Sequence, residues 1–167
     1  MYPVTKLAAA LAFSVGLAGA AHAQAGSALL PDTGTIETAA SANLNFDPVD
    51  SQNISARAGY FFNRNLQAGL EGTYSRIENG TSQDAWTLGA FGNWHVPLGS
   101  PLLPYVGAFV GLSDSSGGQS STSVGLQGGA KWFFNQNVAG FGELRWRDVE
   151  DSDDSLGLFF GLAVFFR

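Results

Sequence analysis

From residue 36 onwards, apolar and polar residues alternate along the chain, and the apolar positions carry even numbers. Such alternation is typical of strands in a sheet whose two faces meet different surroundings. Eight runs show this pattern, spanning residues 36–46, 54–62, 66–76, 86–96, 104–112, 124–134, 138–146 and 156–166. Arg76, at the end of its run, is the one charged residue among their even positions. The pattern therefore predicts an all-β protein of eight strands.

The length of the runs indicates strands that cross a membrane. Runs of 9 to 11 residues match a tilted transmembrane strand, and eight is the smallest strand number of single-chain membrane barrels. With its apolar face inward, the chain would be a soluble lipocalin-like barrel, but so narrow an interior cannot hold this many large side chains. We predict an eight-stranded antiparallel up-and-down transmembrane β-barrel whose even face meets lipid.

Aromatic residues at both ends of the runs fit the two interfaces of a membrane. On the even face, one end carries Phe46, Tyr74, Trp86 and Trp146, and the other carries Phe62, Trp94, Trp132, Phe134 and Phe166. We predict that these nine residues are membrane-interface aromatics.

The segments between the runs predict the orientation of the barrel. The alternate segments 63–65, 97–103 and 135–137 are the shorter set, which is typical of periplasmic turns. The segments 47–53, 77–85, 113–123 and 147–155 are then outer loops. Both chain ends are expected in the periplasm.

The N-terminal segment has the features of an export signal. Lys6 precedes a short apolar stretch at 7–19, and Ala21-His22-Ala23 fits a cleavage site before Gln24. A first core helix is the alternative, which the small-residue triplet disfavours. We predict a signal peptide at 1–23, a short periplasmic segment at 24–33 and the barrel at 34–167.

Composition excludes several classes of protein. Charged residues make up 13% of the chain and the formal net charge is −6, which disfavours disordered and nucleic-acid-binding proteins. Without cysteine, the chain has no disulfide, thiol nucleophile or cysteine metal site.

The odd face carries six charged residues that the barrel would enclose: Glu37, Arg57, Glu71, Lys131, Glu143 and Arg145. Turn length determines which residues of two neighbouring strands lie opposite each other. The three-residue turn at 63–65 places Arg57 directly opposite Glu71, and the three-residue turn at 135–137 places Lys131 diagonal to Glu143. Because unpaired charges in a narrow lumen are costly, we predict an ion-pair network. A polar plug is the favoured interpretation, and a gate whose ion pairs exchange is the alternative.

Aromatic rings share this inward face: Phe61, Phe91, Tyr105, Phe109, Phe133, Phe141, Phe159 and Phe165. They argue against a continuous water channel and favour packing, with a small pocket for an apolar ligand as the alternative. His95 lies at the periplasmic end of its run, without a neighbouring serine or acid, and is interpreted as structural.

The acidic segment 148–155 is the densest run of charge. Asp148, Glu150, Asp151, Asp153 and Asp154 are weak candidates for a Ca²⁺ or Mg²⁺ site. A solvated loop is the favoured interpretation, so we predict no metal, no cofactor and no catalytic residue.

Two turns and the last strand carry a family resemblance. The sequences at 60–66, Tyr-Phe-Phe-Asn-Arg-Asn-Leu, and at 132–138, Trp-Phe-Phe-Asn-Gln-Asn-Val, match each other. With the signal peptide, the eight runs and an aromatic final strand, the chain resembles the small OmpA/OmpX-like outer-membrane barrels of Gram-negative bacteria. Gly161, Val164 and Phe166 resemble that family's signal for the barrel-assembly machinery, although Arg167 follows the terminal aromatic.

The resemblance implies an exported, monomeric protein of the outer membrane. Its expected partners are outer-membrane lipid, lipopolysaccharide and, during biogenesis, the assembly machinery, with no nucleic acid. The outer loops are expected to be too short for a tall protruding sheet, and no peptidoglycan-binding domain is expected after the barrel. The family also includes two lipid A-modifying enzymes, which need a histidine, a serine and a carboxylate near the outer leaflet, and His95 lies at the other end.

These observations favour a barrel with a plugged lumen and a structural, envelope-integrity or surface-interaction role without catalysis. A small-solute pore or a carrier for an apolar ligand is the first alternative. A lipid A-modifying enzyme and an adhesin are weaker ones.

Overall fold

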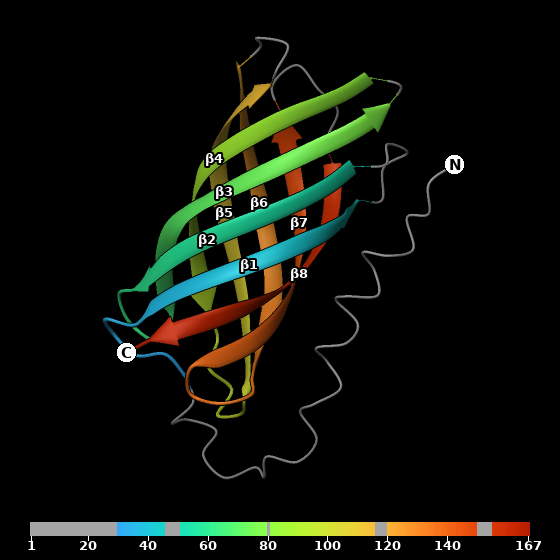
Figure 1. The fold of residues 1–167 in the computed structure, drawn as a ribbon. Coiled ribbons are helices and arrows are strands. Elements are labelled where there is room, and N and C mark those ends of the chain that lie inside the picture. The colour runs from blue at the N-terminus through green and yellow to red at the C-terminus, as the bar shows by residue number, and fades with distance from the viewer. Residues whose placement is uncertain (1–29, 46–50, 80, 116–119, 150–154) are drawn as a thin grey trace.

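Eight antiparallel strands form one closed barrel in the computed structural model (Figure 1), which describes residues 30–45, 51–79, 81–115, 120–149 and 155–167. The strands are β1 (Ile36–Asn45), β2 (Ser51–Phe61), β3 (Leu66–Asn79), β4 (Thr81–His95), β5 (Leu102–Ser115), β6 (Ser120–Phe133), β7 (Val138–Val149) and β8 (Ser155–Phe166). The predicted fold class is confirmed. Among the described residues, no helix is long and apolar enough to cross a membrane. The expected signal peptide and Phe46 lie outside the described residues.

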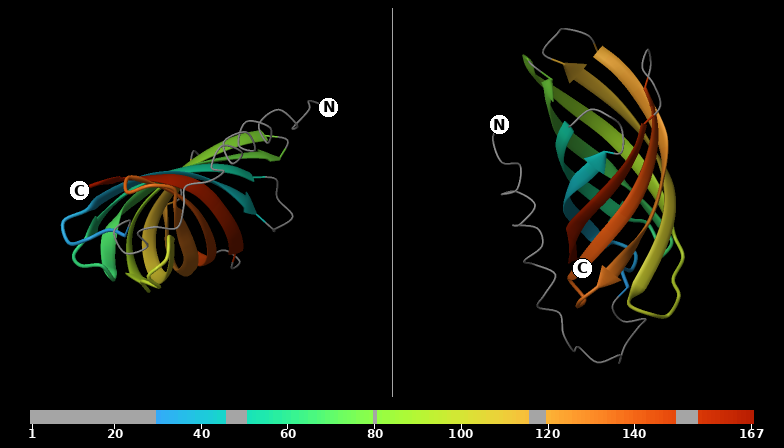
Figure 2. Two further views of the ribbon diagram at one scale, coloured as in Figure 1. Left: turned by 90° about the horizontal axis from the view of Figure 1, so that it is seen from below. Right: turned by 90° about the vertical axis from the view of Figure 1, so that its right-hand side faces the viewer.

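Each strand pairs with its neighbour in sequence, and β1 closes the barrel against β8. The closing register sets Ile36 opposite Phe166. Figure 2 shows the strands tilted around a common axis, as closure of a twisted sheet requires. The described chain begins and ends at the same end of the barrel, where β2–β3, β4–β5 and β6–β7 are joined.

The two faces of the strands follow residue parity without a slip. Every large apolar side chain that is exposed has an even number, and Leu88 and Leu112 are each 67% exposed. From Thr35 onwards, every buried side chain has an odd number. A soluble protein rarely exposes so continuous an apolar surface. We call this surface, formed by the exposed apolar side chains at even-numbered strand positions, the belt. The belt is the surface that meets lipid.

The strands extend further than the apolar pattern predicts. The segments 77–85 and 113–123, expected as outer loops, are largely strand: β3 and β4 continue to Asn79 and Thr81, and β5 and β6 to Ser115 and Ser120. The expectation that these two segments are loops is therefore wrong. Above the belt both faces of a strand can meet water, so pairing continues there without alternation.

The two matching turns use the same hydrogen bonds. Oδ1 of Asn63 accepts from the backbone N–H groups of Asn65 and Leu66, at 2.8 and 2.9 Å. Oδ1 of Asn135 accepts from those of Asn137 and Val138, at 2.8 and 3.0 Å. A side chain that accepts from the backbone two residues on fixes a tight turn, which explains the shared Asn-x-Asn sequence.

Glycines on the inward face allow aromatic rings to lie against the barrel wall. A Cβ at Gly69 would lie 2.1 Å from the carbonyl oxygen of Ala58 and 2.8 Å from the ring of Phe91. On the outward face of the same strand, a Cβ at Gly72 would meet nothing within 4 Å. Glycine is therefore required at such inward positions, because the filled lumen has no room for a side chain there.

This difference predicts opposite results for two neighbouring substitutions. Gly69→Ala should lower the free energy of unfolding by about 1–3 kcal/mol, because backbone of β2 must move to admit the methyl group. Gly72→Ala, its matched control on β3, should change it by less than about 0.5 kcal/mol. Urea titration of the barrel in lipid vesicles measures both, and equal losses would contradict this account of the inward glycines.

Candidate functional site

At the end of the lumen where the described chain begins and ends, an apolar layer, the lower plug, closes the barrel. It consists of Leu30, Phe61, Leu103, Phe133 and Phe165, all almost completely buried. The ring centroids of Phe133 and Phe165 are 4.8 Å apart. Leu30 comes from the segment before β1, expected to be a short periplasmic segment, and its side chain is part of this layer. Its apolar contacts fill the mouth of the barrel.

Residues 30–35 are held at this mouth by hydrogen bonds. Gly34, with φ of +89°, donates its N–H to the carbonyl of Phe61 at 2.9 Å. Arg64 in the β2–β3 turn donates Nε to Oδ1 of Asp32 at 2.5 Å, and both side chains are about half exposed. The hydrogen bond from Arg64 holds the pKa of Asp32 below its usual value.

The Asp32–Arg64 contact predicts a small pH dependence. A carboxylate whose pKa is lower in the folded state contributes stability above its unfolded pKa, near 3.9, and loses it as pH falls through the folded value. Asp32→Asn should therefore reduce the urea midpoint slightly at pH 7, because an exposed ion pair contributes little. The difference from wild type should shrink below about pH 4. A difference that persists unchanged at pH 2 would contradict this assignment.

Above the lower plug, a chain of polar side chains crosses the lumen. Gln127 donates to Asn93 at 2.6 Å, Asn93 donates to Gln67 at 3.4 Å, and Gln67 donates to Glu37 at 3.0 Å. Lys131 donates to Glu37 and also to Gln67. Four strands thus supply one buried network around the Glu37–Lys131 ion pair. Most polar atoms of the network are paired, whereas Oε1 of Glu37 and Oε1 of Gln127 have no hydrogen-bond partner in the described part of the chain.

Glu143 on β7 is the centre of the next layer. Its carboxylate accepts from Arg57 Nη1 at 3.0 Å, from the Tyr105 hydroxyl at 2.7 Å and from Arg145 Nη2 at 2.6 Å. Arg145 also binds Glu71 through two nitrogens, at 2.5 and 3.0 Å. Hydrogen bonds between charged groups, bidentate ones included, are stronger than those between neutral groups.

The Arg57–Glu143 and Arg145–Glu71 pairs cross the lumen instead of following the register of neighbouring strands. Arg57 does lie opposite Glu71 in the β2–β3 register, as the turn length predicts. However, Arg57 pairs with Glu143 and, at 3.6 Å, with Glu37, while Glu71 pairs with Arg145. The expected Arg57–Glu71 pair is thus replaced, and so is a Lys131–Glu143 pair. In a narrow barrel, a long side chain reaches the far wall as readily as its neighbour.

Aromatic rings flank the buried guanidinium groups. Arg57 lies 4.4 Å from the ring centroid of Phe141 and 5.6 Å from that of Phe91. Arg145 lies 4.6 and 4.8 Å from the centroids of Phe159 and Phe109. Cation–π contacts are stronger where water is excluded. The inward rings therefore pack the lumen and also stabilise its charges.

His95 is buried among rings beside the lower plug. Its ring centroid lies 5.1 Å from that of Phe61 and 5.2 Å from that of Tyr105, and neither ring nitrogen has a hydrogen-bond partner in the described part of the chain. No serine–histidine–carboxylate arrangement forms around it there. The structure thus places His95 in a packing position.

Of the remaining candidates, Gly161 faces inward, and the others lie on the exterior or outside the described residues. The described interface aromatics are on the outward face, where Tyr74 packs against Trp86 at 4.8 Å and donates to Asp84 at 2.9 Å. Asp148 is exposed, whereas Glu150, Asp151, Asp153 and Asp154 are not described. No group of three potential metal ligands forms among the described residues. Gly161 faces inward, and a Cβ there would lie 2.2 Å from the Ala40 carbonyl.

A closed barrel with an apolar belt outside and a polar, filled interior defines the class of transmembrane β-barrels. Its fold is that of the small outer-membrane barrels. The solved structures similar to it include the N-terminal barrel domain of Pseudomonas aeruginosa OprF, with 18% identity, 81% of this chain and 100% of that chain covered, and a TM-score of 0.61. Neisserial surface protein A has 19% identity, 78% and 94% coverage and a TM-score of 0.62. P. aeruginosa OprG has 10% identity, 83% and 99% coverage and a TM-score of 0.57.

No protein-family model and no curated protein matches the chain. At these identities the likeness establishes the fold, and the apolar belt of this chain supplies the second argument. Together they define an outer-membrane β-barrel protein. The described chain begins, at residue 30, and ends, at residue 167, at the end of the barrel opposite the extended hairpins, which is the end that the short turns predict to be periplasmic.

Proposed function

We propose that the protein is a closed, non-conducting barrel that contributes to the integrity of the outer membrane or to surface interactions, without catalysis. The observation that carries this proposal is the filling of the lumen by successive layers. The lower plug, the Glu37–Lys131 network and the Glu143 centre each contain side chains from opposite walls of the barrel. An eight-stranded interior is just wide enough for side chains to fill it.

The layers leave little room for solutes. Phe61, Leu103, Lys131 and Phe165 have no measurable solvent exposure. A cavity beside Phe91 and Phe109 has a volume of about 10 Å³, the space of one water molecule. An acyl chain or a sugar needs far more, which argues against the alternatives of a pore and of an apolar-ligand carrier.

Planar-bilayer recording tests the proposal. The purified barrel, inserted at a level confirmed by gel shift of the recovered membrane, should give no discrete conductance steps above those of protein-free bilayers. The expectation follows from the ion pairs that join opposite walls. Reproducible unitary steps would contradict the proposal and favour the small-solute pore.

A surface-interaction role has one observation in its favour. The strands β3 to β6 have 14 or 15 residues, more than the roughly 9–11 that a membrane crossing requires. Pairing continues beyond the last apolar even positions of these strands, as far as Asn79–Thr81 and Asp114–Ser120, and Figure 1 shows the ends of β3 and β4 as one hairpin. Such a rigid projection suits contact with lipopolysaccharide or with another surface. Loss of surface adhesion when residues 77–83 are replaced by a short turn, with the barrel intact, would support this role.

The absence of catalysis is part of the proposal and has its own test. The arrangement around His95 offers no activated nucleophile among the described residues. Overproduction of the protein should therefore leave the mass spectrum of lipid A unchanged. A new lipid A species that disappears with His95→Ala would contradict it.

A further inference from the structure

One lumen cation is not matched by the ion pairs described above. Arg147 has the inward parity of β7, two residues beyond Arg145, and was expected in an outer loop. The three lumen acids Glu37, Glu71 and Glu143 are bound by Arg57, Lys131 and Arg145. Among the described residues, Arg147 has no ion pair, and its guanidinium lies 5.5 Å from the Phe109 ring centroid. The described lumen therefore has one positive charge in excess.

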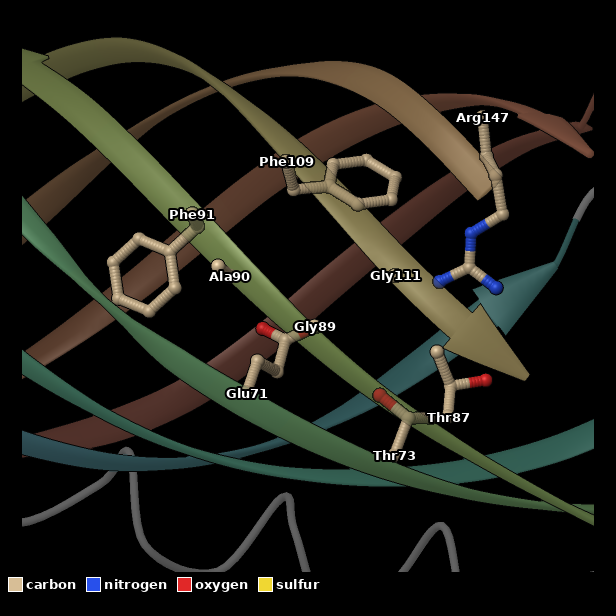
Figure 3. Close-up of a pocket in the computed structure, with 9 residues that line it drawn as sticks. All are labelled: Glu71, Thr73, Thr87, Gly89, Ala90, Phe91, Phe109, Gly111 and Arg147. Carbon is tan, nitrogen blue, oxygen red and sulfur yellow. The ribbon is translucent and has the colours of Figure 1, made fainter. Parts of the chain in front are cut away.

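Arg147 lines a small pocket at the outer end of the lumen (Figure 3). The pocket lies between β3, β4, β5 and β7, and Figure 3 shows the Arg147 guanidinium on the side of Thr87 and Gly111. Thr73 and Thr87 supply hydroxyl groups, while Glu71 at the base has both oxygens bound by Arg145. Because that carboxylate is already neutralised, it does not balance the charge of Arg147.

Some hydroxyl protons at the pocket are not used in the hydrogen bonds between the threonine and serine side chains. Thr73 shares one hydrogen bond with Ser55 at 2.9 Å, and Thr87 shares one with Ser113 at 2.8 Å. Each pair holds two hydroxyl protons and uses one of them between its oxygens. The second proton of each pair is available to an acceptor in or beside the pocket. One guanidinium with hydroxyl donors is suited to a negatively charged acceptor.

We propose that this pocket is an anion site that binds one small inorganic anion, chloride being the one of suitable size. The cavity volume of about 10 Å³ corresponds to a single water molecule, so among common anions only a monatomic one such as chloride comes close to this size. Phe91 and Phe109 form apolar walls, and a weakly hydrated anion tolerates such walls better than a carboxylate or phosphate does. The site lies above the Glu143 layer, so it is compatible with a closed lumen.

The test is the ³⁵Cl NMR line width of the folded barrel in a nonionic detergent at fixed chloride concentration. Wild-type protein should broaden the line beyond the buffer value, and Arg147→Gln should abolish most of the excess. Arg64→Gln, an exposed arginine in the β2–β3 turn, is the matched control and should retain it. Arg147→Lys should retain a part, and Thr87→Val, which preserves shape and charge, should weaken chloride binding several-fold. Heat-modifiable gel migration verifies that each variant is folded.

Two results would overturn the proposal. The first is a wild-type barrel without excess broadening, which would mean that an acidic residue of the chain neutralises Arg147. The second is equal broadening in wild type and Arg147→Gln. If Arg147→Gln does not fold, Arg147→Lys and Thr87→Val still test the proposal, because both keep a positive charge at residue 147 and both should weaken chloride binding.

Discussion

Replacement of Glu143 by glutamine should lower the free energy of unfolding by about 3–5 kcal/mol, the usual loss when one member of a buried ion pair is removed. The side chain is 1% exposed and accepts from Arg57, Tyr105 and Arg145. Glutamine preserves the shape but not the charge. Arg57 would then keep only Glu37, at 3.6 Å, as an acidic partner. Urea titration in lipid vesicles, followed by tryptophan fluorescence and gel mobility, measures the loss.

Asp148→Asn is the matched control for this result, because Asp148 lies on the same strand and is exposed. It should change the free energy of unfolding by less than about 0.5 kcal/mol. Adding Arg57→Met to Glu143→Gln should recover part of the loss, since the uncompensated charge is then gone. Equal effects of Glu143→Gln and Asp148→Asn would show that the layer around Glu143 does not stabilise the barrel.

A charge on the exterior belt should have the second large effect. Leu70 lies midway along the belt part of β3 and is 61% exposed. Leu70→Arg should cost about 2–4 kcal/mol in vesicles, the penalty for arginine on the lipid face near the bilayer midplane. Ser120→Arg, at the tip of β6 beyond the belt, should cost less than about 1 kcal/mol. A similar cost at both positions would argue against lipid around the belt.

Residue parity makes the fold of this chain predictable from its amino-acid sequence. Period-two alternation determines which side chains share a face, and turn length determines the register that sets Arg57 opposite Glu71. Both rules act between neighbouring strands. The outer strand ends were mispredicted, because serine-rich segments such as 120–123 lack alternation once both faces are polar.

These rules do not predict which inward side chains contact each other within the lumen. The Arg57–Glu143 contact joins residues 86 apart in sequence and depends on the lumen's width and on side-chain length. The insertion of Leu30 and the inward position of Arg147 depend on where the strands begin and end. Tyr105 was expected as packing, yet its hydroxyl binds Glu143. The sequence signal for this hydrogen bond was a tyrosine at an inward position among phenylalanines, because a buried hydroxyl group needs a hydrogen-bond partner.

Spin labels on the belt test the central claim most directly, namely that the even face meets lipid. The chain has no cysteine, so single cysteines at 70, 88, 126 and 162 can each carry a nitroxide in a vesicle-embedded barrel. If the even face meets lipid, these labels should collide frequently with oxygen, which concentrates in lipid, and rarely with a water-soluble nickel reagent. A label at Ser120 should show the reverse. Preferential collision with nickel at the four belt positions would contradict the account.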